Sequence, residues 1–323
     1  MRYPRSFLLC AVSLLTYAMY AQGTVEAEFD TIYRYDFNTL KGKHTKRVVI
    51  DASHNTIYSL SYGKQSAREM LRILKADGFQ LAFTEQQLDS TTVHASTVDL
   101  LIIHGMPNDK KVLEADGKKE TLYTSPLSKE EVINIGTYVH EGGSLLLFLS
   151  HFPGGSGALP LLEAFSVKFR DGYAYQSEHH ISEGGRCGHF LMHTGNEMLN
   201  KDHPVFKSTL DTATLPENIK FYCGAAVFRS PEDAILPFPK NTINYTPSRT
   251  SNEDLEESSN DYAGMIGFQY GKGRVVICTD QGIFRSLDLL IDDKRIPVTI
   301  HDPESDNAGL LVNCVRWLTG LQE

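Results

Sequence analysis

Basic residues and long apolar runs are both scarce in this chain. Lys and Arg number 31 against 40 Asp and Glu, which gives a formal net charge of -9. Nucleic-acid binding needs Lys and Arg clustered on one face, and the one short basic run, residues 41–47, precedes the first expected strand. After the N-terminal leader, no stretch reaches the roughly eighteen apolar residues that cross a bilayer. We therefore expect no nucleic-acid partner and no membrane span after cleavage of the leader.

Cysteine is also sparse, with five in 323 residues, one of them in the leader. Cys278 lies in an apolar strand and Cys314 among the leucines of an expected helix, so both are predicted to be buried and unreactive. Cys187 and Cys223 are flanked by glycine or polar residues. These two either form a disulfide in an oxidising compartment or remain free thiols.

The first 23 residues have the layout of a secretory signal peptide. Arg2 and Arg5 precede the apolar residues 7–19, and the small residues Ala21 and Gly23 follow. We expect cleavage after one of these small residues and a periplasmic or secreted protein. A retained N-terminal anchor is the alternative, because export machinery reads both patterns similarly.

Strand and helix patterns alternate along residues 47–321, which predicts a single α/β domain after an N-terminal extension at 24–46. The hydrophobic content of 41% supports a sizeable core. Periodicity weakens from 171 to 262, where glycine and proline are frequent, and this segment is predicted to be a β-rich insertion. We expect strands at 47–54, 79–83, 99–104, 144–149, 167–169, 264–270 and 274–279, and helices at 64–77, 129–141, 158–165 and 307–318.

Three of the expected strands end in histidine: His54, His104 and His151. Parallel neighbours would bring these imidazoles to one edge of the sheet, beyond the carboxyl ends of the strands, where open α/β sheets bind ligands. Polar residues beside the same strand ends would complete the site. The candidate ligand-binding residues are His54, His104, Ser150, His151, Asp51, Asp280 and Gln281.

Several kinds of chemistry fit this set. The histidines could fix turns by donating to loop carbonyls, or they could contact sugar hydroxyls and carboxylates, and neither role needs a cofactor. In the alternative, His54, His104 and His151 bind a divalent metal with one open position, as three imidazoles do in some zinc enzymes. Asp51 or Asp280 would then be the base of a metal-assisted hydrolase.

Four short motifs occur in a familiar order: Val-Val-Ile-Asp-x-x-His-Asn from Val48, Gly-Gly-Ser-Leu-Leu-Leu from Gly142, Gly-Lys-Gly-Arg-Val-Val from Gly271, and Leu-Val-Asn-x-x-Arg-Trp-Leu from Leu311. In this order the chain resembles an uncharacterised bacterial family of the class I glutamine amidotransferase-like superfold, over nearly all of residues 47–321. The resemblance implies a three-layer, flavodoxin-like α/β fold, with a mostly parallel sheet and helices on both faces.

The chain departs from the catalytic branch of that superfold at one point. That branch places a cysteine on a sharp turn after a central strand, with small residues two positions before and after it. Here the turn after Leu149 contains Ser150 and His151, and Phe148 and Phe152 flank Ser150. We therefore expect a degenerate module, without amidotransferase activity, that binds a small polar ligand such as a carbohydrate, or a protein partner, at the strand-end cleft.

Overall fold

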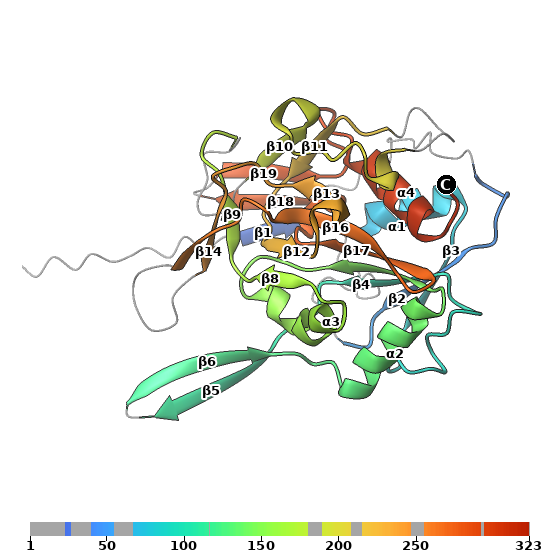
Figure 1. The fold of residues 1–323 in the computed structure, drawn as a ribbon, viewed down its shortest axis with the longest axis horizontal. Coiled ribbons are helices and arrows are strands. Elements are labelled where there is room, and N and C mark those ends of the chain that lie inside the picture. The colour runs from blue at the N-terminus through green and yellow to red at the C-terminus, as the bar shows by residue number, and fades with distance from the viewer. Residues whose placement is uncertain are drawn as a thin grey trace, which may run out of the picture.

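A mostly parallel β-sheet forms the centre of the molecule (Figure 1). The computed structural model describes residues 23–26, 40–54, 67–115, 117–179, 189–207, 215–246, 255–291 and 294–322. Five parallel strands lie in the order β3-β2-β4-β7-β17, which is 2-1-3-4-5 when counted along the chain. Their bounds are β2 Arg47–Asp51, β3 Gln80–Thr84, β4 Leu100–His104, β7 Ser144–Phe148 and β17 Gly273–Cys278.

Antiparallel strands extend this sheet beyond β17. The strand next to β17 is β16, which pairs with both β12 and β13, and β12 in turn pairs with β8. Two strands of the expected insertion therefore belong to the central sheet. The bounds are β8 Lys168–Arg170, β12 Ala226–Phe228, β13 Ala234–Pro237 and β16 Ala263–Tyr270.

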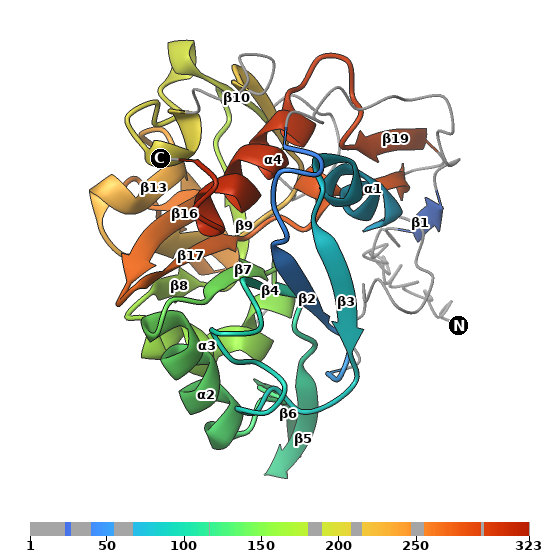
Figure 2. The ribbon, with the colours of Figure 1, turned by 90° about the vertical axis from the view of Figure 1, so that its right-hand side faces the viewer.

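Helices cover both faces of the sheet (Figure 2). The buried residues of α1 (Arg68–Asp77) and α4 (Asn307–Leu318) pack with Leu100 and Ile102 of β4. Those of α2 (Lys129–His140) and α3 (Leu159–Ala164) pack with Leu101 and Ile103. Successive side chains of a strand point to opposite faces, which explains why β4 must be apolar at both sets of positions.

All twelve residues of α4 are buried. The helix contacts β7, β17 and α1, and also β11 and the 3-10 turn η5 from the middle of the chain. A helix that is covered on every side needs no polar face, and α4 is apolar apart from Asn307, Asn313 and Arg316, which are buried as well. Within this packing, Arg316 makes a buried ion pair with Asp77 at the end of α1, with Nη2 and Oδ1 2.6 Å apart.

Local sequence signals predicted the central elements well. Ser128 and Glu131 form the expected capping box of α2, and Gly78 ends α1 in a left-handed conformation at φ 104°. The expected helix 307–318 is α4, residue for residue. The first strand is shorter than expected, because β2 ends at Asp51 and His54 lies in the turn that follows.

The middle of the chain is rich in short strands, as the weak periodicity indicated. One small sheet has the order β15-β14-β9, and β10 pairs with β11. The bounds are β9 Tyr173–Tyr175, β10 Phe190–His193, β11 Asn218–Phe221, β14 Ile243–Thr246 and β15 Leu255–Ser258; the 3-10 turns are η3 Gly154–Ala158, η4 Thr194–Asn196, η5 Pro204–Phe206, η7 Pro231–Asp233 and η8 Gly282–Phe284.

Two antiparallel ribbons were missed by the sequence analysis. The ribbon of β18 (Ser286–Ile291) and β19 (Lys294–Thr299) also pairs with β1 (Gly23–Glu26). The ribbon of β5 (Asp109–Ala115) and β6 (Lys118–Thr124) extends away from the body (Figure 1). The dipeptide Asp116-Gly117 between β5 and β6 is a hairpin signal that could have predicted the second ribbon.

The expected signal peptide falls almost entirely outside the described residues, so its cleavage stays a prediction. Among the described helices, none combines the length and the apolar character that crossing a membrane requires.

Candidate functional site

The strand order places a topological switch point between β2 and β4. From β2 the chain continues to β3 on one side, and from β4 it continues to β7 on the other. Ligands of open α/β sheets bind at the carboxyl edge beside such a point. Asp51 and His104 are the last residues of β2 and β4. We take this edge, and its continuation past β7 to β17, as the candidate functional site.

The prediction that three histidine-bearing strand ends are neighbours is correct, since β2, β4 and β7 are adjacent and parallel. The imidazoles, however, do not gather into one cluster, and each has its own partners. His54 bonds to carboxylates, one of them on α2, whereas His104 lies on Phe148 with ring centroids 4.6 Å apart. His151 stacks on Tyr173 at 4.7 Å.

The expectation of one shared imidazole site is therefore wrong. Only His104 lies within its strand, where the alternation of side chains decides which face it joins. The other two histidines follow their strands, and the local turns orient them. Within the described residues, no group of three or more His, Cys, Asp or Glu side chains is arranged to hold a metal ion. The metal alternative for His54, His104 and His151 stays a prediction.

His54 is held between two carboxylates. Its Nδ1 lies 2.9 Å from Asp51 Oδ2, and its Nε2 lies 3.2 Å from Glu131 Oε1. Glu131 is the capping-box residue of α2, and the same carboxylate accepts from the backbone N–H of Leu88 at 3.1 Å. Because both ring nitrogens face carboxylates, the favoured form of His54 is the imidazolium, which donates at both atoms. This cluster ties the end of β2 to α2.

The ionisation of the cluster agrees with this geometry. Burial lowers the pKa of His54, but the hydrogen bonds and negative charges of Asp51 and Glu131 outweigh burial and raise the pKa above 6.5. Burial raises the pKa of Glu131, yet hydrogen bonds from Ser128 and Leu88 and the charge of His54 lower it overall. His54 is therefore a charged positioning residue, and it offers no lone pair for use as a general base.

A second polar group lies at the ends of β4 and β17. Burial, together with the positive charge of Arg285, lowers the pKa of His104 to about 3, so its ring is neutral. Burial raises the pKa of Asp280 to about 6, although backbone N–H groups of Tyr222 and Gly282 donate to its carboxylate at 2.6 and 2.7 Å. Because β17 runs parallel to β7, Asp280 lies at the carboxyl edge as predicted.

Gln281 reaches from β17 across the end of β7 to the end of β4. Its side-chain amide lies against Gly105, where a Cβ atom would be 2.3 Å from Nε2. Glycine is favoured at position 105 for two reasons. The backbone there has φ 80°, which residues with a side chain rarely adopt, and the Gln281 amide leaves no room for a Cβ atom. Gln281 is 6% exposed, and its Oε1 has no hydrogen-bond partner within the described part of the chain. The sequence identified Gln281 but missed Gly105, Glu131 and Arg285.

The turn after β7 packs Ser150 and His151 closely against their neighbours. Phe148, two positions before it, is fully buried and packs edge-on against Phe284 at 5.8 Å. The next turn is also close, since a Cβ on Gly154 would lie 2.7 Å from Ser150 Cβ. His151 Nδ1 donates to Phe152 O at 2.9 Å, and burial lowers the pKa of His151. Both residues thus belong to a packed turn.

The cysteines follow the sequence prediction where the structure describes them. Cys278 and Cys314 are buried free thiols, and burial raises the pKa of each well above its ordinary value. Neither is suited to form a thiolate nucleophile. Cys223 is disulfide-bonded. Cys187, its predicted partner, lies outside the described residues.

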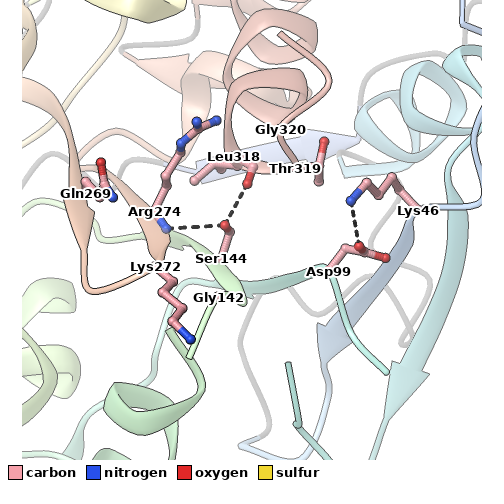
Figure 3. Close-up of a pocket in the computed structure, with 10 residues that line it drawn as sticks. All are labelled: Lys46, Asp99, Gly142, Ser144, Gln269, Lys272, Arg274, Leu318, Thr319 and Gly320. Carbon is pink, nitrogen blue, oxygen red and sulfur yellow. Dashed lines mark hydrogen bonds and ion pairs between the residues drawn. The ribbon is translucent and has the colours of Figure 1, made fainter. Parts of the chain in front are cut away.

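The opposite, amino edge of the sheet also has a polar pocket, of about 180 Å³ (Figure 3). Lys46 pairs with Asp99 at 2.9 Å, and Ser144 Oγ donates to Leu318 O at 2.6 Å and accepts from Arg274 N at 3.3 Å. The Arg274 guanidinium donates to Trp317 O. Figure 3 shows this guanidinium and the Lys272 ammonium pointing in opposite directions. The cations do not converge, so we favour the carboxyl edge as the functional site.

No protein-family model matches the chain, and no curated protein matches it in sequence. One similar solved structure is an exo-β-1,4-mannosidase from Opitutaceae bacterium strain TAV5, 9% identical, with 74% of this chain and 32% of that chain covered and a TM-score of 0.34. This chain thus spans about a third of the mannosidase.

Two other similar structures have nearly the length of this chain. They are ThuA-like proteins from Bacteroides uniformis, 12% identical with a TM-score of 0.46, and from Parabacteroides merdae, 13% identical with a TM-score of 0.42. The first match covers 86% of this chain and 93% of that one, and the second covers 86% and 91%. The solved structures similar to this chain therefore include ThuA-like proteins, which have a class I glutamine amidotransferase-like fold, at low sequence identity.

Proposed function

We propose that this chain is a degenerate amidotransferase-like module, of three-layer flavodoxin-like organisation, that binds a small polar ligand at the carboxyl edge of its sheet. The strand order 2-1-3-4-5 supports this organisation, since flavodoxin-like sheets have the same order and bind their ligand at the same switch point. The ligand would lie over the ends of β4 and β7, beside Gly105 and Gln281.

The buried Oε1 of Gln281 is the observation that carries this proposal. Buried polar side-chain atoms nearly always have a hydrogen-bond partner, and an acceptor left without one costs about 1–3 kcal/mol. Gln281 Oε1 lacks a partner among the described residues, and Gly105 leaves its amide room at the strand end. A donor supplied by a ligand would satisfy this atom.

A hydroxyl-bearing ligand fits this edge better than a purely anionic one. A hydroxyl can donate to Gln281 Oε1 and accept in turn from a neighbouring donor, whereas a carboxylate offers only acceptors. Asp280 beside it adds negative charge when ionised, which also disfavours an anion. We therefore propose a carbohydrate or another polyol, with a donor group of a protein partner as the second candidate.

Two further features support a binding module without catalysis. His54 has both ring nitrogens against carboxylates, and the thiol of Cys278 at the end of β17 is held protonated by burial. Neither group is poised as a base or a nucleophile. The disulfide of Cys223 supports a periplasmic or secreted location, because disulfides persist in oxidising compartments.

A thermal-shift screen of the purified protein against sugars, polyols and carboxylates tests the proposal. We expect at least one hydroxyl-bearing compound to raise the melting temperature, since a ligand that binds only the folded state stabilises it. Gln281→Met, which keeps the size of the side chain and removes the acceptor, should abolish that shift.

Gln322→Met is the matched control. Gln322 is a buried glutamine near the C-terminus whose Nε2 donates to Pro204 O at 2.8 Å, far along the chain from the strand ends. This variant should lower the melting temperature of the free protein and keep the ligand-induced shift. Equal ligand shifts in wild-type protein and Gln281→Met would refute the proposed site. Metal analysis of the same protein tests the hydrolase alternative, which requires a stoichiometric ion lost in His54→Ala and His151→Ala.

A further inference from the structure

The ribbon formed by β5 and β6 projects from the body, which it contacts near its base, where Tyr123 packs edge-on against Phe152. Figures 1 and 2 both show it extending from the body. Its fourteen residues pair with each other from Asp109↔Thr124 to Ala115↔Lys118, and no other described strand joins them. Val112 and Leu113 on β5 are 62% and 49% exposed. A two-stranded ribbon is marginally stable by itself in water, so an added strand would stabilise it.

The register identifies the backbone groups that are available for such a strand. Ala115 and Lys118 are the last partners of the ribbon, with two residues between them in the sequence. In a hairpin of this loop length the last pair is a hydrogen-bonded one, and antiparallel pairs alternate between bonded and non-bonded. Lys110, Val112 and Glu114 are therefore at non-bonded positions. Their N–H and C=O groups point to the outer edge of β5.

We propose that the outer edge of β5 pairs with β5 of a second copy of this chain, antiparallel and centred on Val112. A two-fold axis through Val112 places each Val112 opposite its equivalent and each Lys110 opposite Glu114 of the partner. All three pairs fall on outward-facing backbone positions, so the hydrogen-bond ladder continues without a shift. The two ribbons then form one four-stranded sheet.

Charge complementarity favours a second copy as the occupant. Lys110 already lies over the ring of Tyr123 at 5.8 Å, and Glu114 lies 3.9 Å from Lys119 across the ribbon. In the paired ribbons, Glu114 would lie between Lys119 of its own chain and Lys110 of the other. The two-fold axis repeats this arrangement, so that one such group of three charged side chains lies on each side of the central pair of valines. Opposite charges directly across neighbouring strands are stabilising, and like charges are destabilising.

The other edge of the ribbon lacks this property. On β6 the outward-facing positions are Lys119, Thr121 and Tyr123. The same two-fold operation there places Lys119 opposite Tyr123 and forms no pair of opposite charges. A variant on the β5 edge therefore tests the proposal, and a matching variant on the β6 edge is its control.

Analytical ultracentrifugation of the full chain over rising concentration tests the proposal. We expect a reversible monomer–dimer equilibrium in the wild type. Val112→Pro removes an N–H at the outer edge and keeps the β5–β6 ladder, because proline is tolerated on an edge strand where its nitrogen faces outward. It should weaken the dimer by about tenfold or more. Thr121→Pro makes the same change on the opposite edge and should leave the dimer unchanged.

Charge reversal provides a second, independent measurement. Lys110→Glu places like charges opposite each other twice and should weaken the dimer. The double variant with Glu114→Lys restores opposite charges between the chains and should recover part of the dimer, since the new lysine also faces Lys119 of its own chain. Circular dichroism verifies that each variant is folded. A wild-type chain that stays monomeric up to near-millimolar concentration overturns the proposal. A dimer that survives Val112→Pro also overturns the proposal. The same holds if Thr121→Pro abolishes the dimer and Val112→Pro does not.

Discussion

Both edges of the parallel sheet contain polar side chains, but the contacts of those side chains differ. At the amino edge, Ser144 both donates to Leu318 O and accepts from Arg274 N, and the charges of Lys46 and Asp99 pair with each other. At the carboxyl edge, Gln281 Oε1 is buried without a partner among the described residues. Polar residues mark both edges. The carboxyl edge differs in that its unpaired acceptor lies near the switch point, where open α/β sheets bind their ligands.

A buried ion pair near the amino edge should have the largest effect on stability. Arg316→Ala leaves Asp77, which is fully buried, without its counter-charge, and breaking such a pair costs about 3–5 kcal/mol. Chemical denaturation should show this loss. The double variant Asp77→Leu with Arg316→Met removes both charges and should recover most of it. A single variant as stable as the wild type would contradict the structural role of this edge.

At the carboxyl edge, the cluster around His54 should be the most sensitive to substitution. His54→Ala leaves the carboxylates of Asp51 and Glu131 close together without the imidazolium, and we expect a loss of about 2–3 kcal/mol. Denaturation at neutral pH measures the loss. His94→Ala, at an exposed histidine, is the control and should be nearly neutral.

The same cluster gives a pH dependence with a defined sign. The pKa of His54 is raised in the folded protein, so its stabilisation is complete below pH 6.5 and is lost as pH rises through the raised pKa. The difference in unfolding free energy between wild type and His54→Ala should therefore shrink from pH 6 to pH 9. A constant difference would show that His54 contributes only packing.

Ser144→Ala should have a smaller effect at the amino edge. It removes a donor to Leu318 O and an acceptor of Arg274 N, and each lost bond costs on the order of 1 kcal/mol. We expect a total of about 1–2 kcal/mol by chemical denaturation. Comparing Ser144→Ala with Ser144→Gly separates the effect of the lost hydroxyl on stability from the effect of added backbone freedom.

Gln281→Met should destabilise the free protein least of these substitutions. A buried acceptor without a partner costs about 1–3 kcal/mol, so its replacement by an apolar group of similar size should leave the protein at least as stable as the wild type, or more stable by up to that amount. A loss as large as that of Ser144→Ala would show that Gln281 is structural, and the two edges would then be equivalent.

The sequence predicted the fold better than it predicted the site, and the reason is the range of the signals. Capping at Ser128, termination at Gly78 and the apolar strands are local features, readable over a few residues. The directions of His54, His104 and His151 depend on their position relative to a strand end and on partners far along the chain. Shortening the first strand by three residues was enough to place His54 in a turn against Glu131.

By itself the sequence determined the parallel strands, the four helices and the residues that follow each strand, because periodicity and caps act locally. The tertiary structure decided which of those residues meet. It brought Gln281 to Gly105 across the end of β7, joined His54 to α2, and left the outer edge of β5 unpaired within the described chain. Such contacts depend on strand order and on the two-residue alternation of side chains, and neither can be read from one segment alone.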